Sequence, residues 1–229
     1  PFLRPELIPN AKVTVSGIEH IPRKGGAIIV GNHRSYFDPA VMITTVAKSG
    51  RNGRYLGKKE VFDIPVIGPL LQAGGGIRID RGTGDESAFD AAAAAVQGGD
   101  VVVMFPQGTI PRGQAFFDPV LKGRWGAARL AAMTRAPVIP VGLWGTDEVW
   151  PRSATLPSFN LQDQPEVTAT IGPPVDLKYR SVERDTERIM HALSALLPER
   201  ARQPYDPTPE ELARTFPAGK TDDLGFTGR

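Results

Sequence analysis

The sequence predicts one α/β domain, in which a mainly parallel, mixed sheet is flanked by helices. Short apolar runs alternate with helix-like segments through most of the 229 residues, and this alternation is typical of strands joined by crossover helices. The length suits one sizeable hydrophobic core. Polar and basic residues directly follow several of the expected strands, and such sheets bind ligands at the carboxyl ends of their strands. We therefore expect the functional site at that edge.

Seven segments have the pattern of strands. They comprise residues 13–15, 27–30, 54–56, 76–80, 101–105, 138–141 and 167–171. The run at 27–30 is apolar throughout, which is typical of an interior strand. Segments 13–15 and 167–171 alternate apolar and polar residues, so we expect edge or antiparallel strands there.

Five helices are expected between and after these strands. They comprise residues 39–48, 65–71, 86–97, 123–133 and 184–197. Asp38 and Pro39 have the order of a helix start, with Asp as the N-cap and Pro in the first turn. An alanine run at 91–95 favours the third helix. Leucine and isoleucine side chains at helical spacing indicate that the last helix packs on the core.

The domain is expected to end near residue 200. Residues 1–200 contain all of the predicted strands and long helices, whereas residues 201–229 are polar and rich in Pro and Asp. We expect a loosely ordered tail over 201–229, with one helical turn at 209–212 capped by Thr208.

The composition limits the possible chemistry and partners. The chain has no cysteine and a net charge of +2, and its isoelectric point is near 9.0. Disulfide and thiolate chemistry are therefore excluded, and the charge is far from that of a nucleic-acid-binding protein. Only His, Asp and Glu could bind a metal, and they do not recur at ligand spacing, so we expect no metal site.

The sequence has no segment typical of membrane insertion or secretion. No apolar run approaches the roughly 20 residues of a membrane span, and no signal peptide is visible. We therefore expect a soluble or peripheral protein. Because the chain begins at Pro1 rather than Met, an anchor before Pro1 is left open.

Residues 32–38, with the sequence NHRSYFD, set an imidazole and a carboxylate five positions apart, directly after the expected strand at 27–30. A turn between them would let Asp38 orient the His33 ring for acid–base chemistry. Other interpretations remain open: His33 is a structural residue, Asp38 is only a helix cap, or both bind a metal.

Four sequence blocks follow one another along the chain, and they lie at residues 32–38, 76–81 (GIRIDR), 105–109 (FPQGT) and 138–141 (VIPV). In this order they resemble the HX4D block, the second block, the FPEGT block and the VPV block of the glycerolipid acyltransferases. The similarity is to the 1-acyl-sn-glycerol-3-phosphate acyltransferase (lysophosphatidic acid acyltransferase) type. It covers roughly residues 13–177.

The resemblance implies an O-acyltransferase of phospholipid biosynthesis that needs no cofactor. Such an enzyme moves a fatty acyl group from acyl-CoA or acyl-carrier protein to a free hydroxyl of 1-acylglycerol-3-phosphate and gives phosphatidic acid. His33 would be the general base and Asp38 would orient it. Two alternatives are another phospholipid or glycophospholipid as the acceptor, and a non-catalytic lipid-binding scaffold of the same fold.

The resemblance also suggests a set of substrate-binding residues. It comprises Lys58, Arg81, Gln107, Gly108, Thr109 and Arg112. Arg81 ends the second block, and cations together with backbone donors suit an acceptor that carries a phosphate. For Arg34, Arg51 and Arg54 we expect solvated surface charges.

Two positions depart from the family pattern. Gln107 stands where the family usually has Glu, and an amide can neither carry a charge nor accept a proton. We expect this change to weaken the enzyme, and the sequence leaves open whether it is natural variation or a deliberate substitution. Ile110 stands where the family often has Arg, and Arg112 could take the place of that arginine.

An acceptor held in a bilayer requires contact with the membrane surface. We expect a peripheral protein at the cytoplasmic face of the cell membrane that binds anionic lipid. Candidate contact residues, all of which could equally belong to the core, are Phe2, Leu3, Val66, Ile67, Leu70, Leu71, Phe116, Phe117, Trp144 and Trp150.

Overall fold

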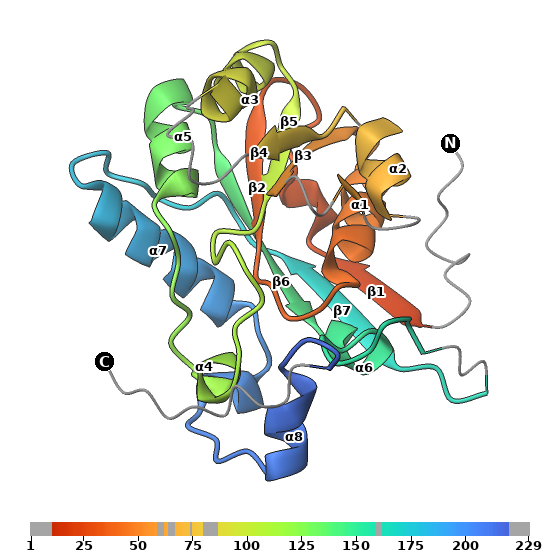
Figure 1. Cartoon of the computed structure of the whole chain (residues 1–229). Coiled ribbons are helices and arrows are strands. Elements are labelled where there is room, and N and C mark those ends of the chain that lie inside the picture. The colour runs from red at the N-terminus through yellow and green to blue at the C-terminus, as the bar shows by residue number, and fades with distance from the viewer. Residues whose placement is uncertain are drawn as a thin grey trace.

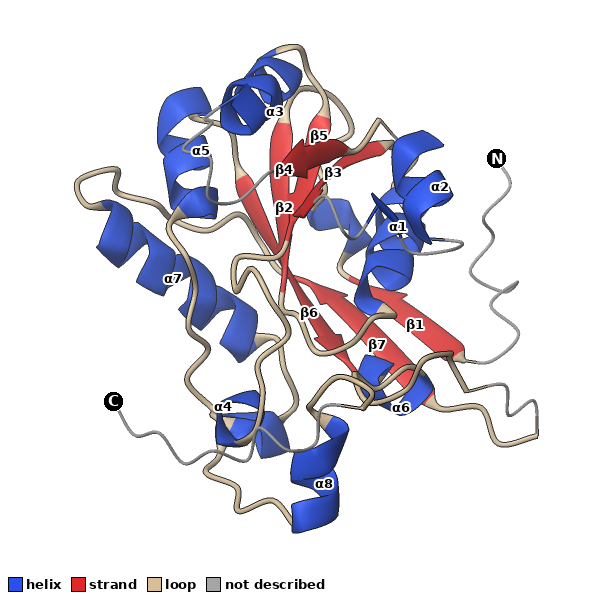
Figure 2. Cartoon of the chain, viewed as in Figure 1, coloured by secondary structure: helices blue, strands red, loops and turns tan. Residues whose placement is uncertain are grey.

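The computed structural model of this chain describes residues 11–58, 62–63, 67–73, 75–79, 87–158 and 162–219. Within them a seven-stranded sheet lies between two layers of helices (Figures 1 and 2). The strands are β1 (Lys12–Ser16), β2 (Ala27–Gly31), β3 (Gly53–Lys58), β4 (Ile77–Ile79), β5 (Val101–Met104), β6 (Val138–Trp144) and β7 (Glu166–Ile171). The predicted α/β class is confirmed.

The sheet is mixed, with strand order β1-β7-β6-β2-β5-β3-β4. From β6 to β4 across the sheet, all neighbours pair in parallel. β7 pairs antiparallel with β6, and β1 pairs parallel with β7. The prediction of edge or antiparallel strands near both ends of the chain is therefore confirmed. The parallel strands direct their carboxyl ends to one edge of the sheet.

The helices cover both faces of the sheet. They are α1 (Asp38–Lys48), α2 (Ile67–Ala73), α3 (Ser87–Gln97), α4 (Gln114–Phe117), α5 (Gly126–Thr134), α6 (Thr146–Val149), α7 (Val182–Ala195) and α8 (Pro209–Arg214), with short 3-10 turns η2 (Ile18–His20) and η4 (Glu199–Arg202). Figure 2 shows α1 and α2 on one face of the sheet and α3, α5 and α7 on the other.

The central strand β2 contributes alternate side chains to two cores. Ile29 belongs to the cluster that contains Met42 of α1, whereas Ile28 belongs to the cluster that contains Leu130 of α5 and Leu193 of α7. All five side chains are fully buried. Because successive side chains of a strand point to opposite faces, a strand covered on both faces must be apolar throughout. Burial of each such side chain contributes about 1.5–3 kcal/mol.

The structure differs from the predicted elements mainly at their ends and in short helices. The helix expected from residue 123 begins at Gly126, and the strand expected to end at residue 141 continues to Trp144. The short elements η2, α4, α6 and η4 were not predicted. Helices of three or four residues have too little periodicity to stand out in a sequence, and their contacts with the rest of the fold determine them.

The segment after residue 200 requires a correction as far as residue 219. The helical turn at 209–212 is present as α8, and its capping box between Thr208 and Glu211 confirms the predicted cap. The segment is not loosely held, because Thr215 and Phe216 are buried. The Thr215 hydroxyl accepts a hydrogen bond of 2.7 Å from the backbone N–H of Gly113. The polar composition of this segment did not indicate that Phe216 is buried or that Thr215 forms a hydrogen bond with Gly113.

Candidate active site

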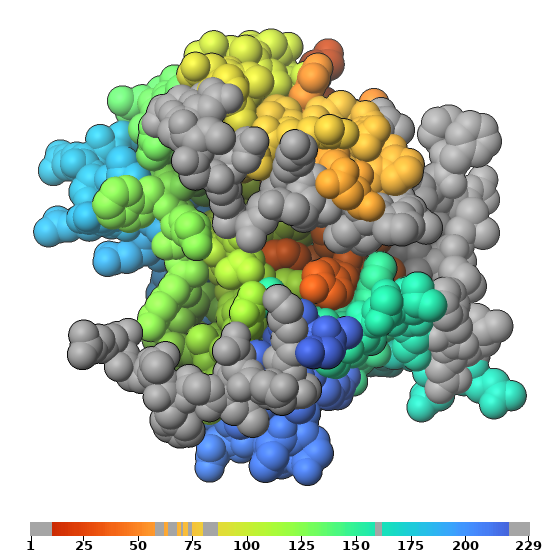
Figure 3. Space-filling model, in the orientation of Figure 1, coloured from red at the N-terminus to blue at the C-terminus, as the bar shows by residue number. Residues whose placement is uncertain are grey.

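The candidate site is formed by the segments that follow β2, β5 and β6 at the carboxyl edge of the sheet. β2 and β5 are neighbours with Val30 opposite Met104, so the residues after both strands lie close together. In Figure 3, orange-red atoms around the start of α1 lie at the centre of this face, between yellow-green atoms of the segment after β5 and teal and blue atoms of the α6 and α8 regions. These segments lie at the edge of the sheet where the sequence predicted the site.

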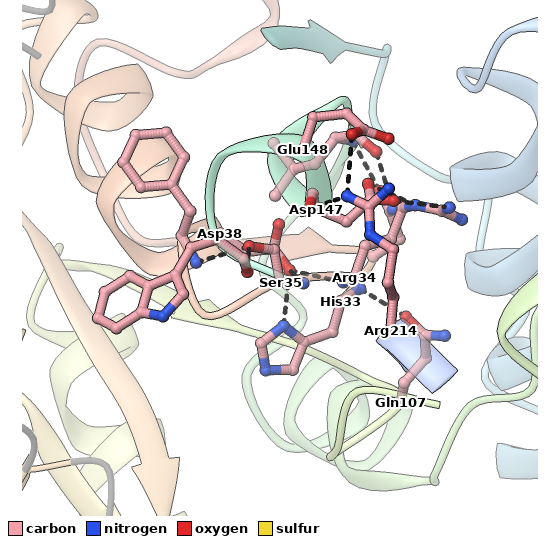
Figure 4. A network of polar contacts seen from close by, with 12 residues as sticks. His33, Arg34, Ser35, Asp38, Gln107, Asp147, Glu148 and Arg214 are labelled. Atoms are coloured by element: carbon pink, nitrogen blue, oxygen red, sulfur yellow. Dashed lines mark hydrogen bonds and ion pairs between the residues drawn. The ribbon is translucent and has the colours of Figure 1, made fainter. Parts of the chain in front are cut away.

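His33 and Asp38 are brought together by a turn. His33 Nδ1 lies 2.7 Å from Asp38 Oδ2. The same oxygen accepts the backbone N–H groups of Arg34 and Ser35 at 2.6 and 2.7 Å. Asp38 is fully buried, and its second oxygen, Oδ1, has no hydrogen-bond partner among the described residues. Three donors on one oxygen fix the carboxylate relative to the imidazole ring (Figure 4).

Asp38 is not the N-cap of α1, as the sequence predicted. Phe37 occupies the cap position without a side-chain cap, and Asp38 is the first helical residue, followed by Pro39. The carboxylate points back into the turn before the helix, where it accepts the N–H groups of that turn. An acidic residue in the first turn still interacts favourably with the helix dipole.

The His33 ring is held on a second side by Phe105. The two rings stack with centroids 4.3 Å apart and planes 18° from parallel, and the His33 side chain is 18% exposed. Because a carboxylate only accepts hydrogen bonds, the neutral ring carries its proton on Nδ1 and leaves Nε2 as an acceptor. This is the geometry of a general base that is open on one side.

Gln107 supports His33 through the backbone. Its Oε1 accepts the backbone N–H of His33 at 2.6 Å, and the residue is 8% exposed. The sequence suggested a substrate-binding role for Gln107 and did not indicate this contact. An amide oxygen accepts this bond as a carboxylate oxygen would. The loss of the family's charge therefore does not remove the link between the segments that follow β2 and β5.

Two other residues of the first block are structural. Asn32 forms two hydrogen bonds with the backbone of Leu143 in β6, at 2.9 and 2.7 Å. The buried Ser35 donates to the carbonyl of Trp150 at 2.6 Å and accepts the N–H of Phe37 at 2.9 Å. The contact with Phe37 lies within the turn, and the contact with Trp150 links the turn to the segment after β6, so the hydroxyl has the turn-forming and hydrogen-bonding role that the sequence favoured.

Arg34 is not the solvated surface charge that we expected. Its guanidinium lies 4.1 Å from the ring centroid of Phe116 and 4.4 Å from that of Trp144. Its Nε is 3.3 Å from Asp147 Oδ1, and Arg214 of α8 is 2.9 Å from the neighbouring Glu148 (Figure 4). Cation–π contacts and an ion pair together tie the site turn to α4 and α6.

Arg51 also is not the solvated surface charge that we expected, whereas Arg54 is. Arg51 donates hydrogen bonds to the backbone carbonyls of Pro22, Gly25 and Gly99 and so joins three loops at the opposite edge. Arg54 is half exposed and pairs with Asp100. The sequence cannot distinguish the structural Arg51 from the exposed Arg54, because the partners of Arg51 are backbone carbonyls, which every residue has.

The predicted substrate-binding residues are placed only in part. Arg81 lies outside the described residues, as does the side chain of Lys58, whose backbone ends β3. Gly108 turns the segment after β5 with φ 71°, a conformation that favours glycine, and its N–H donates to the carbonyl of Phe105 at 2.9 Å. Thr109 lies next in this turn and is half-buried, and Arg112 is exposed beyond it.

Arg152, in the connection between β6 and β7, is a site residue that no motif contains. It is buried, and its Nη1 donates to the carbonyl of Ile110. The Tyr36 hydroxyl accepts a hydrogen bond from the same side chain. Arg152 thus contacts both the turn that carries His33 and the segment that follows β5.

The described residues contain no group of three His, Asp or Glu side chains that could hold a metal ion. No helix within the described ranges is both long enough and apolar enough to cross a bilayer.

A family model described as Acyltransferase matches residues 12–144, which is more than half of the chain. The chain belongs to the acyltransferase family. It is 32% identical over 142 residues to a 1-acyl-sn-glycerol-3-phosphate acyltransferase of Borreliella burgdorferi, covering 59% of this chain and 52% of that protein. It is 32% identical over 159 residues to an uncharacterised protein of Mycobacterium leprae, covering 66% of this chain and 41% of the relative. The chain thus spans about half or less of the length of these two relatives.

The acyltransferase fold is also found in a solved structure. The crystal structure of the 1-acyl-sn-glycerophosphate acyltransferase PlsC from Thermotoga maritima matches with a TM-score of 0.56 and 25% sequence identity, covering 82% of this chain and 75% of that one. The predicted resemblance to the glycerolipid acyltransferases of lysophosphatidic acid type is confirmed by these comparisons.

Proposed function

We propose that this acyltransferase transfers a fatty acyl group from acyl-CoA or acyl-carrier protein to the free hydroxyl of 1-acylglycerol-3-phosphate, giving phosphatidic acid. The observation that carries the proposal is the His33–Asp38 pair at 2.7 Å, with the ring open at Nε2 at the carboxyl edge of the sheet. Membership of the family and the printed activities of its relatives support the choice of substrates.

In the proposed mechanism His33 Nε2 takes the proton of the acceptor hydroxyl while the oxygen attacks the thioester carbonyl. The tetrahedral intermediate then expels the thiolate, the new ester forms, and the imidazolium returns the proton to the departing sulfur. Asp38 Oδ2 keeps Nδ1 protonated and stabilises the imidazolium charge. General base catalysis of this kind contributes about 10²- to 10⁴-fold in rate. The acceptor is itself the nucleophile, so no acyl-enzyme is required.

A non-catalytic scaffold is the alternative that Gln107 suggested. The hydrogen bond from His33 N to Gln107 Oε1 argues against it, because the amide keeps the link that positions the base.

An acceptor panel tests the proposed acyl transfer directly. The protein is incubated with acyl-CoA or acyl-carrier protein and with 1-acylglycerol-3-phosphate, glycerol 3-phosphate or 1-acylglycerol, and products are identified by mass. Phosphatidic acid as the main product supports the proposal, and thioester consumption with another acceptor only would refute the acceptor assignment.

We also propose that the protein binds peripherally to the cytoplasmic face of the membrane through the segment 118–125. Val120 and Trp125 are exposed there, at 67% and 56%, beside the exposed Lys122 and Arg124. The backbone N–H of Arg124 donates to the carbonyl of Pro106, which places this segment against the site. Exposed apolar side chains flanked by cations suit an anionic lipid surface.

The contact residues expected from the sequence are less suitable or lie outside the described residues. Phe116 and Leu71 are buried, and Phe117, Trp144 and Trp150 are partly buried. The remaining candidates fall outside the described backbone or side chains, and these are Phe2, Leu3, Val66, Ile67 and Leu70.

A further inference from the structure

Arg152 is a buried cation without a carboxylate partner in the described part of the chain. The residue is 9% exposed, and none of the ion pairs formed among the described residues includes it. Its Nη1 donates to the carbonyl of Ile110, and its Nε is buried with no hydrogen-bond partner among those residues. Buried guanidinium groups are usually neutralised by an anion. This one has donor capacity that the described residues do not use.

The positive charge of Arg112 acts on Arg152. Arg112 is exposed two residues beyond Ile110. Burial and then the positive charge of Arg112 lower the pKa of Arg152 from its ordinary value, and a hydrogen bond to the Tyr36 hydroxyl opposes this effect. An anion bound between the two guanidinium groups would offset the unfavourable positive charge that Arg112 exerts on the buried Arg152.

The two arginines adjoin the proposed catalytic pair. Tyr36, which accepts a hydrogen bond from Arg152, lies in the turn between His33 and Asp38. Ile110, whose carbonyl Arg152 contacts, follows three residues after Gln107, which holds the His33 backbone. An anion on the arginines would therefore lie next to the two segments that position the base.

We propose that Arg152, together with Arg112, binds the phosphate group of the acyl acceptor and so determines the choice of a phosphorylated acceptor. This proposal rests on the proposed function, since it assigns the binding site of that acceptor. Guanidinium groups donate in a planar fork that matches phosphate oxygens and remain charged at every physiological pH. Arg152 lies in the β6–β7 connection, outside the four sequence blocks. A phosphate bound by Arg152 would lie beside the turn that carries His33.

The test compares Arg152→Met and Arg112→Gln with Lys48→Gln. Lys48 is an exposed cation at the far end of α1, so its loss changes the net charge equally and serves as the control. We expect each arginine variant to raise KM for 1-acylglycerol-3-phosphate by about tenfold or more, which corresponds to about 1.4 kcal/mol, and to leave KM for the neutral 1-acylglycerol nearly unchanged. Unchanged KM for the phosphorylated acceptor, or equal losses with both acceptors, would overturn the proposal.

A binding measurement separates this proposal from the proposed function. Glycerol 3-phosphate is titrated calorimetrically into the parent protein and the same three variants, with inorganic phosphate as a second probe. Binding that is weakened by Arg152→Met and Arg112→Gln but not by Lys48→Gln supports the anion site even if no acyl transfer is detected. Binding that neither arginine variant weakens refutes the site even if the enzyme is active. Should Arg152→Met fail to fold, the exposed Arg112 carries both comparisons alone.

Discussion

Replacing Gln107 with Leu removes the acceptor of the His33 backbone N–H while nearly keeping the volume of the side chain. The bond that is lost measures 2.6 Å, and Gln107 is 8% exposed, so water has little access to replace it. A buried donor left without a partner costs about 1–3 kcal/mol. If that cost falls entirely on the transition state, at about 1.4 kcal/mol per tenfold change, kcat/KM falls roughly 5- to 150-fold. Any part that falls on the ground state lowers the free energy of unfolding instead.

The assay measures thiol release from acyl-CoA with 1-acylglycerol-3-phosphate as acceptor, together with thermal unfolding. Gln97→Leu, at an exposed position near the end of α3, is the matched control. Gln107→Glu keeps an oxygen acceptor for the His33 N–H, so we expect its kcat/KM to stay close to that of the parent. A large gain with Gln107→Glu would instead indicate that the amide is a weakening substitution. A Gln107→Leu variant with both parental kcat/KM and parental stability would refute the positioning role of Gln107.

Three further predictions concern Asp38 of the proposed catalytic pair, the buried Asp185 and the proposed membrane contact at Trp125. Asp38→Asn removes the charge that stabilises the imidazolium, and we expect kcat to fall about 10²- to 10⁴-fold with little change in KM; a loss in KM alone would contradict this. Burial raises the pKa of Asp185, but hydrogen bonds from the N–H groups of Lys178 and Tyr179 and from Arg188 outweigh it, so the pKa is lowered. Its stabilisation is therefore present above the ordinary Asp pKa and lost as pH falls through the lowered value. Chemical denaturation should show Asp185→Asn to be about 2 kcal/mol less stable at neutral pH, with a difference that shrinks in acid; a difference independent of pH would contradict this. Trp125→Asp should weaken sedimentation with anionic vesicles, whereas Leu156→Asp, at another exposed apolar residue, should not; equal effects would argue against the 118–125 contact.

The order of strands and long helices could be predicted because each has its own local pattern. The apolar run of β2 reflects burial on both faces, and the alternation in β1 and β7 reflects one wet face. The docking of the segment after residue 200 could not be predicted. It depends on Phe216 and Thr215 meeting partners about a hundred residues earlier in the chain, and no local pattern encodes that distance.

The candidate site was predictable where chemistry coincides with a motif. His33 and Asp38 lie in one block, and the turn between them brings their side chains to 2.7 Å. The contacts of Gln107, Arg34 and Arg152 were not predictable, because each joins segments from different strand ends. Two of these residues contact backbone groups, which have no signature in the side-chain sequence. A buried arginine and an exposed one look alike in a sequence until their neighbours are known.

The most direct test of the account is the single-turnover rate of acyl transfer in His33→Ala, measured with saturating acceptor. His191→Ala, at an exposed histidine on α7, is the matched control. If His33 is the general base, the rate should fall about 10²- to 10⁴-fold in His33→Ala and stay at the parental value in His191→Ala, with acceptor binding and thermal stability retained in both. A His33→Ala protein that still transfers acyl groups at the parental rate would contradict the central claim.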